Sequence, residues 1–217
     1  PEKRRQWKAL WGAEAAKYNV LPLDWRASER LNSELRGRPS LARGRPSSTY
    51  YPGTGGLPDA ASPSMINKSW TITADIDLPA GNENGVVVTH GGLEGGYGLY
   101  LRNGKPTFVY NYLSIDRQTF AAKNALPKGK TKLVVDFKYD GPGDAKGIAA
   151  LGKGGAITVS ANGKTLAQGR MEKTIPIQFS LGEGLDIGED VGSPVDFTYK
   201  LPFKFTGKIE KVTYELK

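Results

Sequence analysis

Apolar and polar residues alternate along most of the chain after residue 68. Between Ser69 and Leu78, apolar side chains occupy every second position, and threonine or aspartate fills most positions between them. A period of two is typical of a β-strand with one buried side and one solvent-facing side. Similar segments lie at residues 86–88, 97–101, 107–113, 117–122, 130–139, 157–160, 165–170, 177–181, 186–188 and 203–216. About ten to twelve short strands separated by turn residues predict a sandwich of two antiparallel sheets.

Glycine-containing turns separate these predicted strands. Asn103-Gly104 and Asn162-Gly163 are dipeptides typical of tight β-hairpins. The glycines between residues 91 and 98 lack the spacing of a phosphate-binding loop, and no helix is predicted after them. We therefore interpret them as a sharp turn between two strands.

One helix is predicted before the strands. Residues 2–18 are rich in Lys, Glu, Ala, Arg and Gln, and apolar residues recur at helical spacing on one face: Trp7, Leu10, Trp11, Ala15 and Tyr18. Two tryptophans on one helix face are too much apolar surface to leave in water. This face either packs on the sandwich or completes a preceding domain. We favour the second alternative, because an isolated leading helix commonly completes a neighbouring domain.

Residues 23–66 are predicted to form an irregular strap, because Pro and Gly recur too often for regular elements. The net charge of +8 is concentrated at this end. Residues 1–46 carry 11 Lys+Arg and 5 Asp+Glu, whereas residues 47–217 carry 19 and 17. Arg38, Arg43 and Arg45 lie among Gly, Pro and Ser without interleaved aromatic residues, which disfavours nucleic-acid binding. We expect them to pair with carboxylates of another domain.

The composition limits the possible chemistry. None of the 217 residues is a cysteine, which excludes disulfides, thiolate metal sites and a cysteine nucleophile from this chain. No apolar run is long enough to span a membrane. The chain begins at Pro1 without an initiator methionine, so we expect a piece of a longer protein. We favour a periplasmic or secreted location over a cytoplasmic one.

Few residues are candidates for a ligand site. His90 is the sole histidine, so it cannot form a multi-histidine metal site, but its ring could point into a cleft. Asp186, Glu189 and Asp190 cluster in one turn, which is either a Ca²⁺ loop or, more simply, a solvated turn. Tyr97 is one of several tyrosines that could stack on a sugar ring, although alternation places most of them in the core. No catalytic residue, metal ligand or cofactor site is assigned.

Several short motifs occur together in a specific order. They are Ala13 to Asp24 (AEAAKYNVLPLD), Arg38-Pro39-Ser40, Gly44-Arg45, Tyr50-Tyr51-Pro52-Gly53, Gly91-Gly92, Gly95-Gly96-Tyr97, Leu99-Tyr100, Asn103-Gly104, Tyr110-Asn111, Leu126-Pro127-Lys128-Gly129, Phe137-Lys138-Tyr139-Asp140, Gly152-Lys153-Gly154-Gly155, Phe179-Ser180, Asp186-Ile187-Gly188 and Phe205-Thr206-Gly207. In this combination the chain resembles the C-terminal region of long bacterial arylsulfatases over essentially its whole length. Together with the alternating pattern, this predicts an all-β fold class: a two-sheet antiparallel β-sandwich of jelly-roll, concanavalin A-like type, preceded by one α-helix and an irregular strap.

The resemblance implies that the chemistry belongs to another part of a longer protein. Arylsulfatases of this class hydrolyse sulfate esters with a formylglycine, made from the first residue of a C/S-x-P-x-R motif, beside a Ca²⁺. That motif is absent from this sequence. Formylglycine and Ca²⁺ would therefore belong to the parent enzyme. The implied domains are a helix that completes the upstream catalytic domain (1–22), the basic strap (23–66) and the β-sandwich (67–217).

Two functions are consistent with such a chain. The first is a non-catalytic accessory domain that docks on the catalytic domain of an arylsulfatase and shapes its substrate cleft with loops near His90 and residues 186–190. Its docking residues would be Trp7, Trp11, Arg38, Arg43 and Arg45. The alternative is a lectin-like carbohydrate-binding module that targets sulfated glycans. A stand-alone hydrolase is a more distant third reading, because no convincing nucleophile and base are present.

Overall fold

The alternating pattern forms strands, and one helix precedes them. The computed structural model describes residues 1–23, 37, 39, 41–42 and 44–217. Its elements are the helix α1 (Glu2–Lys17), the strands β1 (Ser47–Tyr50), β2 (Trp70–Leu78), β3 (Gly85–Gly92), β4 (Gly95–Arg102), β5 (Lys105–Tyr112), β6 (Asp116–Ala121), β7 (Gly129–Tyr139), β8 (Lys153–Ala161), β9 (Lys164–Lys173), β10 (Leu185–Ile187) and β11 (Lys208–Leu216), and the 3₁₀ helix η1 (Gly147–Ala150). Among these residues, no helix is long and apolar enough to cross a membrane.

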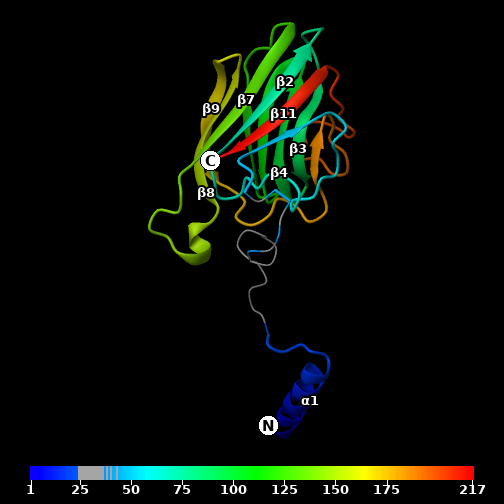
Figure 1. The fold of residues 1–217 in the computed structure, drawn as a ribbon, viewed down its shortest axis with the longest axis vertical. Helices are drawn as coiled ribbons and strands as arrows, with labels where there is room; N and C mark the ends of the chain where they lie inside the picture. Colours follow the sequence, from blue (N-terminus) through cyan, green and yellow to red (C-terminus); the bar gives the residue numbers. More distant parts are fainter. Residues whose placement is uncertain (24–36, 38, 40, 43) are drawn as a thin grey trace.

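The strands form two antiparallel sheets that pack face to face (Figure 1). One sheet has six strands in the order β1-β11-β2-β7-β8-β9, and the other has five strands in the order β10-β3-β4-β5-β6. Strand β2 pairs with β7 on one side and with β11, the last strand of the chain, on the other. The predicted fold class, a two-sheet antiparallel β-sandwich preceded by one helix, is confirmed.

Strand β2 supplies the centre of the core. Its alternate residues Trp70, Ile72, Ala74, Ile76 and Leu78 are all at most 2% exposed. They pack between the sheets against apolar residues of both, which include strands β4, β5 and β7. The period of two read from the sequence therefore marks the buried side of this strand.

The outer face of the five-stranded sheet is also covered, by residues 189–205, which we call the covering segment. Val195 and Tyr199 of this segment are buried in a second apolar cluster against Val86, Tyr100 and Val109 of the sheet. A hydrogen bond also joins the sheet to this segment: the Tyr100 hydroxyl donates to Asp196 Oδ2 at 2.7 Å. Strands β3, β4 and β5 are thus buried on both faces along most of their length, whereas the edge strand β6 is partly exposed.

The glycine-rich turn between β3 and β4 is a sharp hairpin, as predicted. Gly91 has φ +81° and Gly96 has φ +146°, values that favour glycine. A Cβ at Gly96 would lie 2.0 Å from the carbonyl oxygen of His90, and one at Gly91 would lie 2.1 Å from that of Gly95. The turn therefore requires glycine both for conformation and for space.

Two segments differ from the sequence-based expectation. Residues 177–181 are irregular and form no strand, and Phe179 from this segment packs into the core. The last part of the strap contributes to the sandwich, since β1 pairs with β11, and Met65 and Ile66 are buried in the core. Regular pairing is possible only where a neighbouring strand presents its backbone, which alternation alone cannot show.

The helix α1 stands apart from the sandwich (Figure 1). Trp7 is 67% exposed and Trp11 is 52% exposed, so packing of this face on the sandwich, the less favoured of the two alternatives, is not observed. Docking of this face on an upstream domain stays a prediction. Of the three arginines expected to dock, Arg45 is exposed, and Arg38 and Arg43 lie outside the described residues.

Candidate functional site

His90 is buried at the end of β3 instead of pointing into an open cleft. Its Nε2 lies 2.5 Å from Asp59 Oδ1, and its side chain is 1% exposed. Its ring lies against Phe179 and Tyr97, at centroid distances of 5.1 Å and 5.8 Å. The other carboxylate oxygen of Asp59 accepts the backbone N–H of Phe179 at 3.1 Å. Through these contacts, Asp59 of the strap binds both His90 at the end of β3 and Phe179 in the segment 174–184.

Tyr97 faces the core. It is fully buried, and its hydroxyl lies 2.9 Å from the hydroxyl of Tyr214 in the opposite sheet. Burial and the neighbouring Tyr214 raise the pKa of Tyr97 well above its usual range. This ring joins the two sheets and presents no surface to a sugar.

The three acidic candidates occupy different environments. Asp186 Oδ1 accepts the backbone N–H of Gly56 at 2.6 Å, and burial raises the pKa of this carboxyl. Asp190 accepts a hydrogen bond from the hydroxyl of Tyr199, and burial raises its pKa to about 6. Glu189 is partly exposed. In the part of the chain that the structure describes, no group of three or more His, Cys, Asp and Glu side chains is placed to hold a metal ion.

Glu189 lies in a groove between the end of β10 and the start of β11, which we call the β10–β11 groove. The groove has a volume of about 530 Å³. It is lined by Pro52, Gly53, Ile187, Gly188, Glu189, Lys204, Phe205, Gly207, Lys208 and Ile209. Its apolar side chains can contact the C–H face of a sugar, and its charged side chains can bind polar or acidic substituents.

A second hollow, which we call the β6–β9 cleft, lies between two edge strands, β6 and β9. It has a volume of about 460 Å³ and contains Lys123 and Lys164. The rest of its lining consists of Ala122, Asn124, Ala125, Leu126, Pro127, Ala161, Asn162, Thr165 and Leu166. No aromatic ring lies in this lining, in contrast to Phe205 in the β10–β11 groove.

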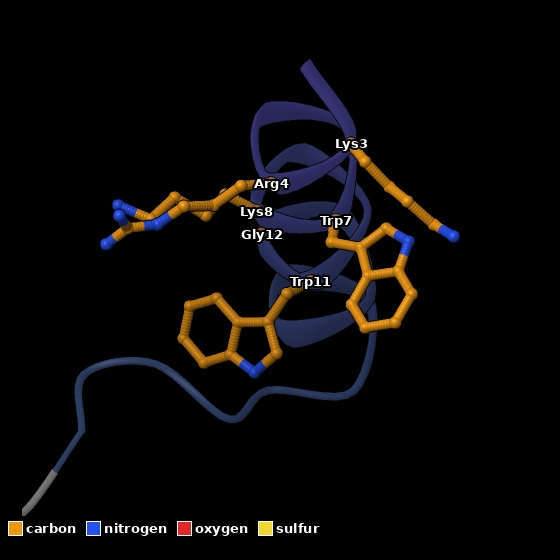
Figure 2. A pocket seen from close by; sticks show the side chains of 6 residues that line it. All are labelled: Lys3, Arg4, Trp7, Lys8, Trp11 and Gly12. Atoms are coloured by element: carbon orange, nitrogen blue, oxygen red, sulfur yellow. The ribbon is translucent and has the colours of Figure 1, made fainter. Parts of the chain in front are cut away.

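The third candidate surface is the exposed face of α1. Trp7 and Trp11 are one helical turn apart, with Lys3, Arg4 and Lys8 around them (Figure 2). The ammonium nitrogen of Lys3 lies 5.8 Å from the centre of the Trp7 ring. A face that is apolar at its centre and basic at its rim is suited to an acidic protein surface.

Sequence reasoning missed most of the β10–β11 groove. Residues 203–216 were predicted as one strand, but β11 begins only at Lys208, and Lys204 makes an isolated bridge to Val86. Pro202 and Gly207 within the sequence LPFKFTG are signals that could have shown the break. Asp59, the partner of His90, had no signal in the sequence because its role depends on the folded strap.

Two solved structures similar to this chain contain the CBM40 of an IT-sialidase from Ruminococcus gnavus. The CBM40 bound to α2,3-sialyllactose matches with a TM-score of 0.53 and 14% identity, over 79% of this chain and 89% of that chain. A second structure of this CBM40 matches with a TM-score of 0.52 and 16% identity, over 79% of this chain and 90% of that chain. The fold is a concanavalin-like jelly roll. At these identities the likeness shows the fold alone.

No family model matches the sequence, and no curated protein is similar to it. The resemblance to the C-terminal region of arylsulfatases therefore stays a prediction based on the motifs named above. The concanavalin-like, jelly-roll part of that prediction is confirmed by the fold.

Proposed function

We propose that this chain is a non-catalytic carbohydrate-binding module, and that its ligand occupies the β10–β11 groove. The observation that supports this most is the fold, which is similar over 79% of the chain to a CBM40 with sialyllactose bound. A module of this kind fits a secreted or periplasmic protein that acts on glycans.

The groove has the chemistry that an acidic sugar requires. Partly exposed Ile209, beside the edges of Phe205 and Ile187 (8% and 3% exposed), gives it a small apolar surface on which the C–H groups of a pyranose ring can pack. Lys204 and Lys208 are exposed at the groove and can pair with a carboxylate or sulfate substituent. Glu189 is the carboxylate of the groove and can accept hydrogen bonds from sugar hydroxyls.

The test is isothermal titration of the full chain with α2,3-sialyllactose, a sulfated lactose and neutral lactose. We expect the two acidic sugars to bind more tightly than lactose, because only they offer an anion to the lysines. The variant Lys204→Ala/Lys208→Ala should weaken binding of sialyllactose about tenfold, which corresponds to about 1.4 kcal/mol.

Lys123→Ala/Lys164→Ala is the matched control, because it removes the same charge from the β6–β9 cleft. Its affinity should equal that of the unaltered chain. If none of the three sugars binds, the carbohydrate proposal is wrong. If the control variant loses affinity and the groove variant does not, the ligand lies in the other cleft.

The second candidate function is a structural one, and the exposed Trp7 and Trp11 favour it. In this reading, α1 and Arg45 dock on the catalytic domain of an arylsulfatase, of which this chain would be the C-terminal accessory part. The intact mass of the natural gene product, together with a search of its digest for a formylglycine peptide, tests this reading. A product of 23.5 kDa without that peptide would contradict it.

A further inference from the structure

Four loops meet at the end of the sandwich where β3 ends, and we call this surface the loop end. They are residues 93–94, 113–116, 181–183 and 191–197. The backbone N–H of Leu93 donates to Ser193 Oγ at 2.9 Å, and the side chain of Asn111 donates to the carbonyl of Leu93 at 3.0 Å. Asn111 also accepts the backbone N–H of Ser114 at 3.0 Å. These bonds hold three of the loops side by side.

The fourth loop lies against the third. A Cβ at Gly192 would lie only 2.4 Å from Glu183 Oε2, which places residues 181–183 in contact with residues 191–197. Arg117 orders the far side, because its Nε donates to the carbonyl of Val195 at 3.1 Å and its guanidinium group lies 3.9 Å from the centre of the Phe197 ring. Hydrogen bonds therefore hold the backbone of the loop end in a defined arrangement.

The loop end exposes an unusual amount of apolar surface. Six of its side chains are large, apolar and at least 40% exposed: Leu93, Leu113, Ile115, Leu181, Val191 and Phe197. Ile115 and Leu181 are the most exposed, at 77% and 75%. Several large apolar side chains exposed on neighbouring loops are typical of an interaction site.

The charge of the loop end is opposite to that of α1. The four loops contain Glu94, Asp116 and Glu183 at the surface, a buried Asp196, and no Lys or Arg, and Arg117 beside Phe197 is the basic residue that borders them. The helix α1 contains five Lys or Arg and two Glu, and three of its basic residues surround Trp7 and Trp11. One surface is aliphatic with acidic residues, and the other is aromatic with basic residues.

We propose that the loop end binds the helix α1 of a second copy of this chain. Within one chain, α1 stands apart from the sandwich and leaves both surfaces open (Figure 1). In a two-fold symmetric pair, each copy gives one helix and receives one, so both surfaces of both copies are covered. Trp7 and Trp11 are 67% and 52% exposed, so the four tryptophans of such a pair would bury roughly 350–600 Å². The loop residues that receive the helices bury a similar area, so the interface reaches about 1,000 Å², the lower bound for a specific complex.

The test is the mass of the full chain in solution, measured by light scattering during size-exclusion chromatography at several concentrations. One chain has a mass of 23.5 kDa, and we expect twice this mass, with dissociation of the dimer on dilution. Trp7→Ala/Trp11→Ala and Ile115→Asp/Leu181→Asp should each return the mass to that of one chain. The altered side chains are exposed, so circular dichroism should show that both variants remain folded.

Ile148→Asp is the matched control, because Ile148 is 70% exposed but lies in η1, outside the four loops. It should remain a dimer. Mixing the tryptophan variant with the loop variant should restore a dimer in part, because the first retains an intact loop end and the second an intact helix.

Three results would overturn the proposal. One is a single-chain mass at all concentrations with Trp7 and Trp11 accessible to acrylamide quenching. This result would favour an upstream domain as the partner of α1. Another is a single-chain mass with both tryptophans protected, which would mean that α1 closes on its own sandwich. The last is a dimer that survives both double variants. None of these results bears on sugar binding, so the carbohydrate proposal is tested independently.

Discussion

Replacing Trp70 by alanine is expected to lower the free energy of unfolding by about 3–5 kcal/mol. Trp70 is 2% exposed, and its ring centre lies 5.3 Å from Phe137, 5.9 Å from Phe108 and 6.4 Å from Tyr97. The substitution leaves a cavity between the sheets that these rings cannot fill without moving, so both transfer energy and packing are lost. Since domains are commonly stable by about 5–15 kcal/mol, the variant should be marginal.

Urea unfolding followed by far-ultraviolet circular dichroism measures this effect, with Trp7→Ala as the matched control. Trp7→Ala removes the same indole group from an exposed position of α1, so the free energy of unfolding of this variant should differ from that of the unaltered chain by less than about 0.5 kcal/mol. Equal losses for the two variants would show that Trp70 is not the centre of the core.

The stability of the sandwich should fall as the pH rises from about 4 to about 6, by a contribution of about 2–3 kcal/mol from Asp190. Burial raises the pKa of Asp190 from 3.8 to about 6 in the folded chain. Within this window the folded state retains a proton that the unfolded state releases. Raising the pH therefore favours unfolding, and the contribution levels off above pH 6.

Asp190→Asn isolates this contribution. The amide stays neutral and its oxygen can still accept the hydrogen bond from Tyr199, so the variant should be more stable than the unaltered chain at pH 7 and nearly equal to it at pH 4. The measurement is urea unfolding of both proteins at several pH values. Parallel pH curves would contradict the prediction.

Asp140→Asn provides a control of opposite sign. A hydrogen bond from Arg170 lowers the pKa of Asp140, so its contribution is present above about pH 4 and is lost as the pH falls through the lowered pKa. At pH 7, Asp140→Asn should lower the free energy of unfolding. Asp190→Asn should raise it at the same pH. The two variants thus distinguish the effect of a buried carboxylate on stability from that of an exposed, ion-paired one.

The candidate residues illustrate how far the sequence can predict a site. Glu189 was grouped with Asp186 and Asp190, and it does line a groove, whereas the other two are buried with hydrogen-bond partners. His90 was expected at a strand end, which is correct, but its partner Asp59 lies 31 residues earlier in the chain. Spacing along the chain shows which residues are near a turn, but it does not show which of them the turn buries.

The covering segment was the least predictable part. Its buried residues Val195 and Tyr199 are separated by Asp196, Phe197 and Thr198, and the segment around them sustains neither a period of two nor one of 3.6. The outer face of β4 and β5 carries Tyr100 and Val109, an apolar signal that a second layer was needed. The sequence does not identify which segment supplies that layer.

The sequence by itself determined the strand pattern, the two-sheet sandwich and the presence of one leading helix, because these depend on local alternation and helical spacing. Only the tertiary structure decided which faces are covered, which titratable groups are buried, and which loops form the grooves and the loop end. Those features depend on contacts between residues far apart in the chain, such as Tyr97 with Tyr214 and His90 with Asp59. Such contacts form only when the two sheets close on each other and the strap folds against them, so no local pattern encodes them.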